Sequence, residues 1–390
     1  MKPFLVLITA LSTAALAAVD SASSAPLDEV HTIETDSLAG VTSVAISPDG
    51  RFLYSAAFFQ GTVATFQRNP ETGELVQDDV ITAPNLNAAV SISLSRDGAH
   101  AVVSAFQANA ITLFSRDAET GRLTQRDAVS EGEDGASGLN FVVRGVFSKD
   151  GRFIYTASSG GIGVFEIVDN QLKFIQIETA EGQLQGMRDI RLSPDGKTIY
   201  AAGTVSNSLA VLHPDPETGK LQTVQTFNNQ IDDLPSLGGV FYIACSPDGK
   251  NVYTNSGRFG GENAVSVFEV LEAGELKFIE AHTNGVDGFD GFVGGNGIGV
   301  SPDGRMVYAL ATISDQMARF SRDQTTGKLT LLGLQSVGPF SEQGSATLCV
   351  SPDGKFIYVA DESSSAIVVF AAPKSEETEA ASPEPPPPGQ

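Results

Sequence analysis

Short runs of apolar residues, separated by turn residues, make up most of this chain. In residues 44–46 and 190–192 the large apolar side chains occupy every second position, which is the spacing of a β-strand. Residues 51–54 (Arg-Phe-Leu-Tyr) begin the next strand, and their composition suits a strand covered on both faces. The pattern predicts an all-β protein of short strands joined by tight turns.

A four-residue phrase, Ser-x-Asp-Gly, lies between successive strands and recurs seven times. Its serine, aspartate and glycine are residues that close a hairpin turn. Successive copies are 48, 53, 45, 53, 55 and 50 residues apart, which matches one four-stranded propeller blade and is too long for ankyrin or tetratricopeptide repeats. We predict a seven-bladed β-propeller of four-stranded antiparallel blades. The aspartates of the phrase are Asp49, Asp97, Asp150, Asp195, Asp248, Asp303 and Asp353.

Two further markers repeat with the phrase. A Thr-Gly-x-Leu sequence ending at Leu75, Leu123, Leu221 and Leu329 predicts the turn between the third and fourth strands, and copies three and five carry degenerate forms of it. A tyrosine stands five residues after the aspartate in six copies, and Val102 replaces it in the second. These tyrosines are Tyr54, Tyr155, Tyr200, Tyr253, Tyr308 and Tyr358.

The two ends of the repeat region complement each other. The seventh copy stops after residues 366–370 with no fourth strand, whereas residues 27–35 form an extra strand before the first blade. Pairing the two would close the ring and remove the exposed edges of an open array. We therefore predict one propeller domain over residues 27–372, with blade 7 built from both termini.

The segments outside the repeats have their own signatures. Residues 1–18 contain a lysine, an apolar run and an Ala-Leu-Ala cleavage site, and we expect a signal peptide that makes the protein secreted or periplasmic. The apolar run is too short for a membrane span. Residues 373–390 are rich in Glu, Pro and Ser, and we expect a disordered tail.

Composition narrows the range of partners. The net charge of −23 argues against nucleic acids and anionic membranes, which require basic surfaces. We expect a monomer. Cys245 and Cys349 stand at different distances from their phrases in non-adjacent blades, so we expect no disulfide between them. No nucleophile elbow, phosphate loop, zinc-ligand spacing or Rossmann glycine pattern is present, so we expect no cofactor.

The repeats resemble the seven-bladed propellers of the lactonase family, which includes 6-phosphogluconolactonase and carboxymuconate cyclase, and their exported relatives with Tyr-Val-Thr-Asn repeats. Residues 252–255 (Val-Tyr-Thr-Asn) nearly spell that last motif. The resemblance covers about residues 27–370 and implies the propeller fold, with a site at one mouth of its central channel.

The sequence departs from the enzymes of that family at one informative place. They commonly carry a Pro-His or Gly-Pro-Arg-His step at the start of the first strand of a blade, which brings an imidazole to the channel mouth. No blade of this chain reproduces the step, and His31, His100, His213 and His282 lie elsewhere in the repeat. The resemblance therefore implies the location of a site without supplying its catalytic residues.

One blade breaks the repeat close to the expected channel. Two positions before the phrase the residue is small or apolar in six copies, but blade 4 has Arg191 there. Asp189 lies two residues before Arg191 on the same strand face, and Arg188 is next to Asp189 in the chain. In blade 3 the repeat position of Asp189 is occupied by Arg144. A partly buried guanidinium needs an anionic partner. The group predicts either an arginine clamp for a carboxylate or phosphate, or an internal ion pair that fixes how blades 3 and 4 meet.

Other loops supply weaker candidates. Arg258 and Glu262, in a loop of blade 5, could shape a pocket together with the glycine-rich residues that follow His282. Asp287 and Asp290 in that segment offer oxygen ligands for calcium, but the spacing differs from an EF-hand, and ordinary turn chemistry explains them better.

Two functions remain open from the sequence. The first, which we favour because the histidine is missing, is an exported module that binds a small anion, a glycan or a protein at the channel mouth. The alternative is a lactone hydrolase or cycloisomerase in which Arg144, Arg188 and Arg191 hold a substrate carboxylate, while Asp189 or Glu262 assists proton transfer.

Overall fold

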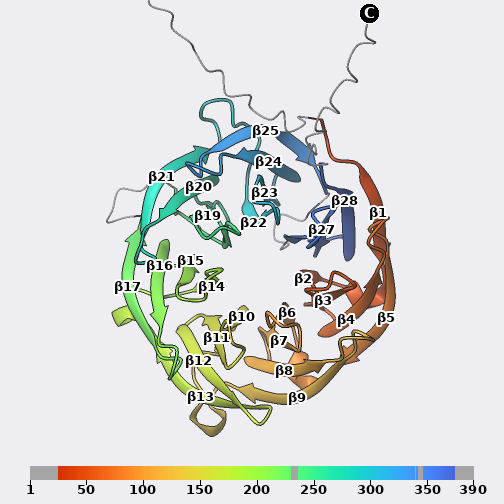
Figure 1. Cartoon of the computed structure of the whole chain (residues 1–390), viewed down its shortest axis with the longest axis vertical. Helices are drawn as coiled ribbons and strands as arrows, with labels where there is room; N and C mark the ends of the chain where they lie inside the picture. Colours follow the sequence, from red (N-terminus) through yellow and green to blue (C-terminus); the bar gives the residue numbers. More distant parts are fainter. Residues whose placement is uncertain (1–24, 230–235, 339, 341–345, 374–390) are drawn as a thin grey trace, which may run out of the picture.

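The structure, a computed structural model, describes residues 25–229, 236–338, 340 and 346–373. Its strands form seven four-stranded antiparallel sheets, arranged as blades around a common axis (Figure 1). The predicted seven-bladed β-propeller is confirmed. The predicted signal peptide and residues 374–390 of the predicted tail lie outside the described residues.

Each blade consists of strands a to d, with a nearest the axis and d at the rim (Figure 1). The a strands are β2 (Val41–Ile46), β6 (Ala89–Leu94), β10 (Arg144–Phe147), β14 (Met187–Leu192), β18 (Tyr242–Cys245), β22 (Gly295–Val300) and β26 (Ala346–Val350). The b strands are β3 (Phe52–Ala57), β7 (His100–Ala105), β11 (Phe153–Ser158), β15 (Ile199–Gly203), β19 (Asn251–Asn255), β23 (Met306–Ala311) and β27 (Phe356–Asp361).

The outer half of each blade follows the same order. The c strands are β4 (Thr62–Arg68), β8 (Ala110–Arg116), β12 (Gly161–Val168), β16 (Ser208–Pro214), β20 (Ala264–Val270), β24 (Gln316–Arg322) and β28 (Ala366–Ala371). The d strands are β5 (Leu75–Thr82), β9 (Leu123–Ser130), β13 (Gln171–Glu178), β17 (Leu221–Asn228), β21 (Leu276–Thr283), β25 (Leu329–Ser336) and β1 (Glu29–Glu34).

Short 3₁₀ turns occur in some loops that lead from strand d to the next strand a. They are η1 (Asp36–Leu38), η2 (Pro84–Leu86), η3 (Glu133–Gly135) and η4 (Ala180–Gly182). Among the described residues, no helix has the length and apolar character needed to cross a membrane.

The N-terminal strand closes the ring as predicted. Strand β1 pairs antiparallel with β28, and Ile33 lies opposite Ile367 in that pairing. The fourth sheet position of blade 7 is thus filled from the other end of the chain. Closure leaves every blade packed between two neighbours, which is what the ring needs to bury the faces of its sheets.

Hydrophobic cores lie between the blades. The described residues contain seven buried apolar clusters, and each one joins two neighbouring sheets. In the cluster between blades 1 and 2, for example, Tyr54 and Ile92 pack with Phe114, and all three are at most 2% exposed. Stability therefore comes from blade-on-blade packing. Cys245 and Cys349 are both free and lie in separate clusters.

The repeated phrase folds the same way in each blade. In blade 2 the hydroxyl of Ser95 donates to Asp97 Oδ1 over 2.6 Å, and the same carboxylate oxygen accepts the amide N–H of Ala99 over 3.0 Å. The amide of His100 donates to Ser95 Oγ over 2.9 Å. Because both polar side chains are engaged within the turn, the phrase needs serine and aspartate at these two positions.

The phrase also joins neighbouring blades through an arginine. Arg116, at the end of strand c in blade 2, donates from Nε to the hydroxyl of Tyr54 in blade 1 over 2.7 Å. Its Nη2 contacts Asp49 Oδ2 at 3.2 Å, and its Nη1 donates to the carbonyl of Gly98 over 3.2 Å. The Tyr54 hydroxyl in turn donates to the carbonyl of Gly121 over 2.7 Å. We call this set of bonds an arginine latch.

The latch recurs at two further interfaces. Arg68 bonds Tyr358 and Asp353 of blade 7, and Arg322 bonds Tyr253 and Asp248 of blade 5. The glycine of the Thr-Gly turn belongs to the same contact, because a Cβ on Gly121 would stand 2.3 Å from the Phe52 ring and its φ is +74°. The repeat tyrosine and the Thr-Gly turn are therefore elements of the interface between blades.

The buried tyrosines give the fold a pH dependence that can be tested. Burial raises the pKa of Tyr54, Tyr253 and Tyr358 from 10.0 to about 12. It also raises the pKa of the other three repeat tyrosines. A folded-state pKa above the unfolded value means that the stabilising contribution is complete below pH 10 and is lost as the pH rises through 12. We expect the free energy of unfolding, measured with urea, to fall by up to about 1.4 kcal/mol per pH unit for each tyrosine across this range. Tyr54→Phe should reduce the slope, and an unchanged slope would contradict the assignment.

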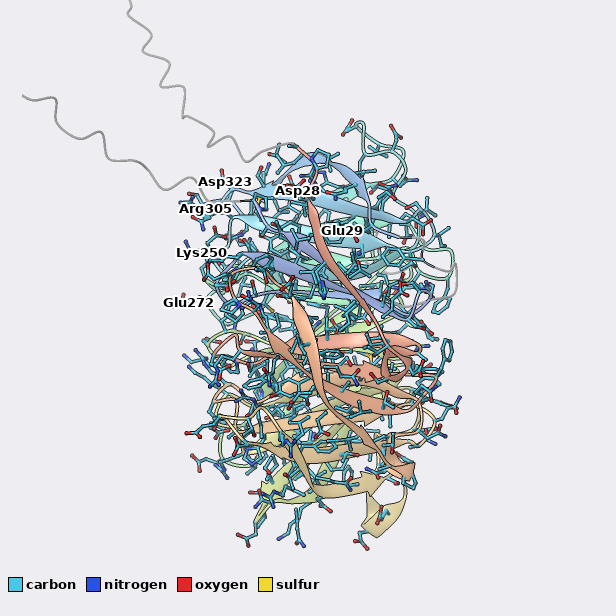
Figure 2. All side chains as sticks on the ribbon, turned by 90° about the vertical axis from the view of Figure 1, so that its right-hand side faces the viewer. Asp28, Glu29, Lys250, Glu272, Arg305 and Asp323 are labelled. Carbon is cyan, nitrogen blue, oxygen red and sulfur yellow. The ribbon has the colours of Figure 1, made fainter. Side chains whose placement is uncertain are left out.

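The disc has two different faces. The a–b and c–d turns lie on one of them, as Figure 2 shows for Lys250 and Arg305 of the a–b turns and for Glu272 and Asp323 of the c–d turns, which all follow the same edge. We call this the phrase face. The b–c and d–a loops lie at the opposite strand ends and form the loop face. We call the inner part of these loops, together with the first residues of the a strands, the loop-face mouth.

Candidate functional site

The first residues of the a strands line the loop-face mouth. In blades 1, 2, 4 and 6 a register shift, or β-bulge, falls among these residues. A bulge leaves one residue out of the pairing and re-aims its side chain. In blade 4 the residue outside the pairing is Arg188, which stands between Met187 and Asp189.

Asp189 is the centre of the predicted charged group and is fully buried. Its Oδ1 lies 2.6 Å from Nε of Arg144 in ion-pair contact, although the N–H is poorly aligned for a hydrogen bond. Its Oδ2 lies 3.3 Å from Nε of Arg191 and accepts the amide N–H of Ile243 over 2.8 Å. The carboxylate therefore joins blades 3, 4 and 5, which gives it the structural role considered from the sequence.

Arg191 is only partly used by this network. Its Nε also donates to the carbonyl of Ile243 over 3.0 Å, but its Nη atoms have no partner among the described residues, and the side chain is 28% exposed. Burial lowers the pKa of Arg191, as does the positive charge of Arg144, while Asp189 opposes both effects. One end of the guanidinium is held and the other remains accessible.

Arg188 has even fewer protein contacts. It is half-buried, and within the described part of the chain it makes no ion pair. Its guanidinium carbon lies 5.9 Å from the ring centre of Phe106 and 5.8 Å from that of Phe241. Burial lowers the pKa of Arg188 below its ordinary value. Aromatic faces stabilise the cation, but they do not supply the hydrogen-bond acceptors that a guanidinium requires.

We call Arg144, Arg188, Asp189 and Arg191 the charged wall. Arg258 lies beside it, because Arg188 and Arg258 both contact the ring of Phe241. Glu262, in contrast, supports a loop. Arg258 is 3% exposed, donates from Nη1 to Thr312 Oγ1 over 2.7 Å, and lies 5.9 Å from the ring centre of Phe241. Burial lowers its pKa, against the opposing negative charge of Glu362. Glu262 Oε1 accepts from Nδ2 of Asn229 over 2.7 Å, which connects the b–c loop of blade 5 to the preceding d–a loop.

The remaining sequence candidates lie away from this wall. His282 is in the rim strand β21, where its ring centre lies 5.0 Å from that of Phe320 and its Nε2 is 3.5 Å from Glu280 Oε1. Asp287 and Asp290 are exposed in the d–a loop that follows β21. Among the described residues no cluster of three or more His, Cys, Asp or Glu side chains could hold a metal ion.

The chemistry available at the mouth is anion recognition. Arg144 and Arg191 share a single carboxylate, that of Asp189, and Arg188 adds a further cation without an ion pair among the described residues, so the local charge is positive in a chain whose net charge is −23. Asp189 is poorly suited to act as a base, because both of its oxygens are engaged. Burial raises the pKa of Cys245 to about 12, so its thiol is neutral and a weak nucleophile.

Comparison with known proteins agrees with the repeat pattern. The family model described as "Lactonase, 7-bladed beta-propeller" matches residues 7–143, 133–232 and 242–378. The chain belongs to this lactonase family. An uncharacterized protein of Lactococcus lactis is 28% identical over 185 residues, which is 47% of this chain and 51% of that protein. The chain thus spans about half the length of the curated relatives it matches first.

Two further relatives of this lactonase-family chain have functional names. The 6-phosphogluconolactonase of Bacillus subtilis is 28% identical over 148 residues, covering 38% of this chain and 40% of that enzyme. The solved structure of the periplasmic gluconolactonase of Pseudomonas aeruginosa superimposes with a TM-score of 0.62 at 21% identity, covering 76% of this chain and 86% of that one. The second comparison supports the shared fold alone.

The histidines of this lactonase-family protein are remote from the charged wall. His31 is in the closing strand β1, His100 begins β7, and His213 lies near the end of β16. With His282 on β21, none of the four stands at the start of an a strand. The loop-face mouth therefore has no histidine at the start of an a strand, as the sequence indicated.

Sequence reasoning missed the aromatic part of the mouth. Phe58 and Phe106 occupy the same repeat position, nine residues after the phrase aspartate, and both lie in b–c loops. Their ring centres are 6.1 Å apart, and Phe106 also contacts Phe141 and Arg188. Counting from the phrase into the b–c loops would have revealed the pair, because a repeated phenylalanine in a loop has no role in turn formation.

Proposed function

We propose that the loop-face mouth binds a small organic anion, and that Arg188 and Arg191 are the residues that bind it. The observation that carries this proposal is the half-buried guanidinium of Arg188, which has no ion-pair partner among the described residues. A partly desolvated guanidinium is stabilised by a carboxylate or phosphate that accepts its N–H groups. The accessible end of Arg191 offers further donors.

The proposal includes export, because a signal peptide at residues 1–18 is expected from the sequence. The ligand would then be met outside the cytoplasm. N-terminal sequencing of the mature protein, recovered from the periplasm or medium, tests this part. A mature N-terminus close to residue 18 is expected, and a protein retained in the cytoplasm with Met1 intact would contradict it.

Binding is tested by titration with inorganic phosphate, benzoate and 6-phosphogluconate in a calorimeter. We expect Arg188→Met to weaken the binding of these anions by at least about tenfold, because the charge-assisted hydrogen bonds of its guanidinium are lost. Arg191→Met should act in the same direction. Arg305→Met, an exposed arginine in an a–b turn of the phrase face, is the matched control and should leave affinity unchanged. Absence of binding, or equal weakening in the control, would contradict the proposal.

Hydrolysis of an anionic lactone is the second candidate, and family membership together with the Bacillus subtilis relative favours it. The arginines would hold the substrate anion or stabilise the oxyanion that forms when water attacks the lactone carbonyl. A panel of sugar and aromatic lactones, followed by acid release, tests it. Turnover that is lost in Arg191→Met and kept in His282→Ala would support hydrolysis at this mouth. Rates equal to the uncatalysed reaction would leave binding as the function.

A further inference from the structure

The mouth carries an arc of phenylalanine side chains. Phe58 contacts Phe59 and Phe106 with ring centres 5.8 and 6.1 Å apart, and Phe106 contacts Phe141 at 5.0 Å. Arg188 continues the arc from Phe106 to Phe241. The arc thus extends from the b–c loop of blade 1 to the start of strand a in blade 5.

Part of this arc is exposed, which core packing does not explain. Phe59 is 68% exposed and Phe141 is 47% exposed. Phe259, whose ring centre lies 5.9 Å from that of Phe241, is 71% exposed. Exposed phenylalanines that gather at one part of a surface mark it as a contact for an apolar partner.

The position of Arg188 connects the apolar and charged parts of the mouth. A guanidinium that lies over aromatic faces keeps its N–H groups at its edge, where a carboxylate can accept two of them. Phe106 and Phe241 flank that same guanidinium at nearly equal distances. Phe241 is buried, whereas Phe106 is half-buried and contacts the exposed Phe141. A ligand that places its carboxylate on Arg188 would therefore bring its body against Phe106 and Phe141.

We infer that the ligand is an aryl carboxylate, whose anionic group binds Arg188 and whose planar ring stacks on Phe106 and the exposed Phe141 beside it. The inference rests on the proposed anion site and names its ligand class. Aromatic rings stack favourably in offset or edge-to-face geometry, which a saturated ring cannot reproduce. A polyhydroxylated sugar acid would leave hydroxyl groups unpaired against phenylalanine.

Two carboxylic acids that differ in aromaticity test the inference. We expect 2-naphthoate to bind the full-length protein at least about tenfold more tightly than trans-decahydro-2-naphthoate, which has the same carbon skeleton and charge. Phe106→Leu and Phe141→Leu should each remove most of that preference. Phe174→Leu, a half-buried phenylalanine on the rim strand β13, is the matched control and should keep it.

Each alternative outcome has a distinct meaning. Equal affinity for the two acids, with both weakened by Arg188→Met, would overturn the aryl assignment while leaving the anion site intact. A preference that survives in both phenylalanine variants would also overturn it. Failure of both acids and of inorganic phosphate to bind would refute the proposed function, and the inference with it.

Discussion

Replacing Asp189 by asparagine is expected to lower the free energy of unfolding by about 3–5 kcal/mol, because it removes one partner of a buried ion pair. The substitution keeps the shape of the side chain and one oxygen for the amide of Ile243. It removes the only carboxylate within ion-pair distance of Arg144 and Arg191 among the described residues. Arg144, which is 7% exposed, is then a buried cation with no counter-charge.

Urea unfolding of the purified variant measures the loss. Asp290→Asn is the control, since it makes the same chemical change at an exposed loop position and should cost less than about 0.5 kcal/mol. The double variant Asp189→Asn with Arg144→Met should recover part of the stability, because the stranded cation is removed. A loss below about 1 kcal/mol, or a loss in the double variant that equals or exceeds the sum of the two single losses, would show that the pair does not stabilise the fold.

The comparison of Asp189 with Arg188 separates structure from function. Asp189 is fully buried and engaged on both oxygens, so its loss should be seen in stability. Arg188 is half-buried and lies on aromatic rings, so its loss should be seen in ligand affinity. In our proposal, two adjacent residues of one strand carry the two roles that the sequence left open for the group as a whole.

The fold was predictable because each blade repeats its own turn chemistry. The hydrogen bonds that close the turn around Asp97 join residues within five positions of one another, so the structure of the turn follows from local sequence. The missing fourth strand of blade 7 was equally visible, as a gap in a repeat. The latches were not predicted, because Arg116 and Asp49 are 67 residues apart and meet only once the blades stack.

The site was predictable only where it broke the repeat. Arg191 stood out because six other blades have small or apolar residues at its position. The same alignment gave Arg144 the position in blade 3 that Asp189 has in blade 4, and the two residues form an ion pair. The sequence predicts His282 beside a loop pocket because it ends a strand, but its side chain lies on the rim strand β21 and packs on Phe320. Glu262 turned out to brace a neighbouring loop through Asn229. Such placements depend on tertiary packing, which a repeat alignment does not contain.

The second large effect is expected at the latch between blades 5 and 6. Arg322, whose side chain is fully buried, donates from Nε to the Tyr253 hydroxyl over 2.6 Å and from Nη2 to both oxygens of Asp248 over 3.0 Å. It also donates to Asn251 Oδ1 over 2.6 Å and to the carbonyl of Gly304 over 3.0 Å. Arg322→Met removes all of these bonds and should lower the free energy of unfolding by about 2–4 kcal/mol.

Arg322→Lys tests whether geometry or charge provides this stability. A lysine restores the positive charge, but it cannot reproduce the planar fork that reaches a hydroxyl, a carboxylate and two other acceptors from one side chain. We therefore expect Arg322→Lys to remain closer to Arg322→Met than to the wild-type protein in urea unfolding. Arg305→Met, in the exposed a–b turn of the same blade, should change stability by less than about 0.5 kcal/mol.

Interfaces that lack a latch indicate that Arg322→Met should lower stability without preventing folding. Blade 4 offers Asp195 and Tyr200 to blade 5 in the same way, yet Val270 stands at the end of strand c where Arg322 stands in blade 6. That interface is held by its apolar cluster and by the bond from Tyr200 to the carbonyl of Gly274. Arg322→Met should therefore give a folded propeller of reduced stability. A variant as stable as the wild-type protein would show that the apolar cores alone hold the ring together. An unfolded variant would show that the latch is indispensable at this interface.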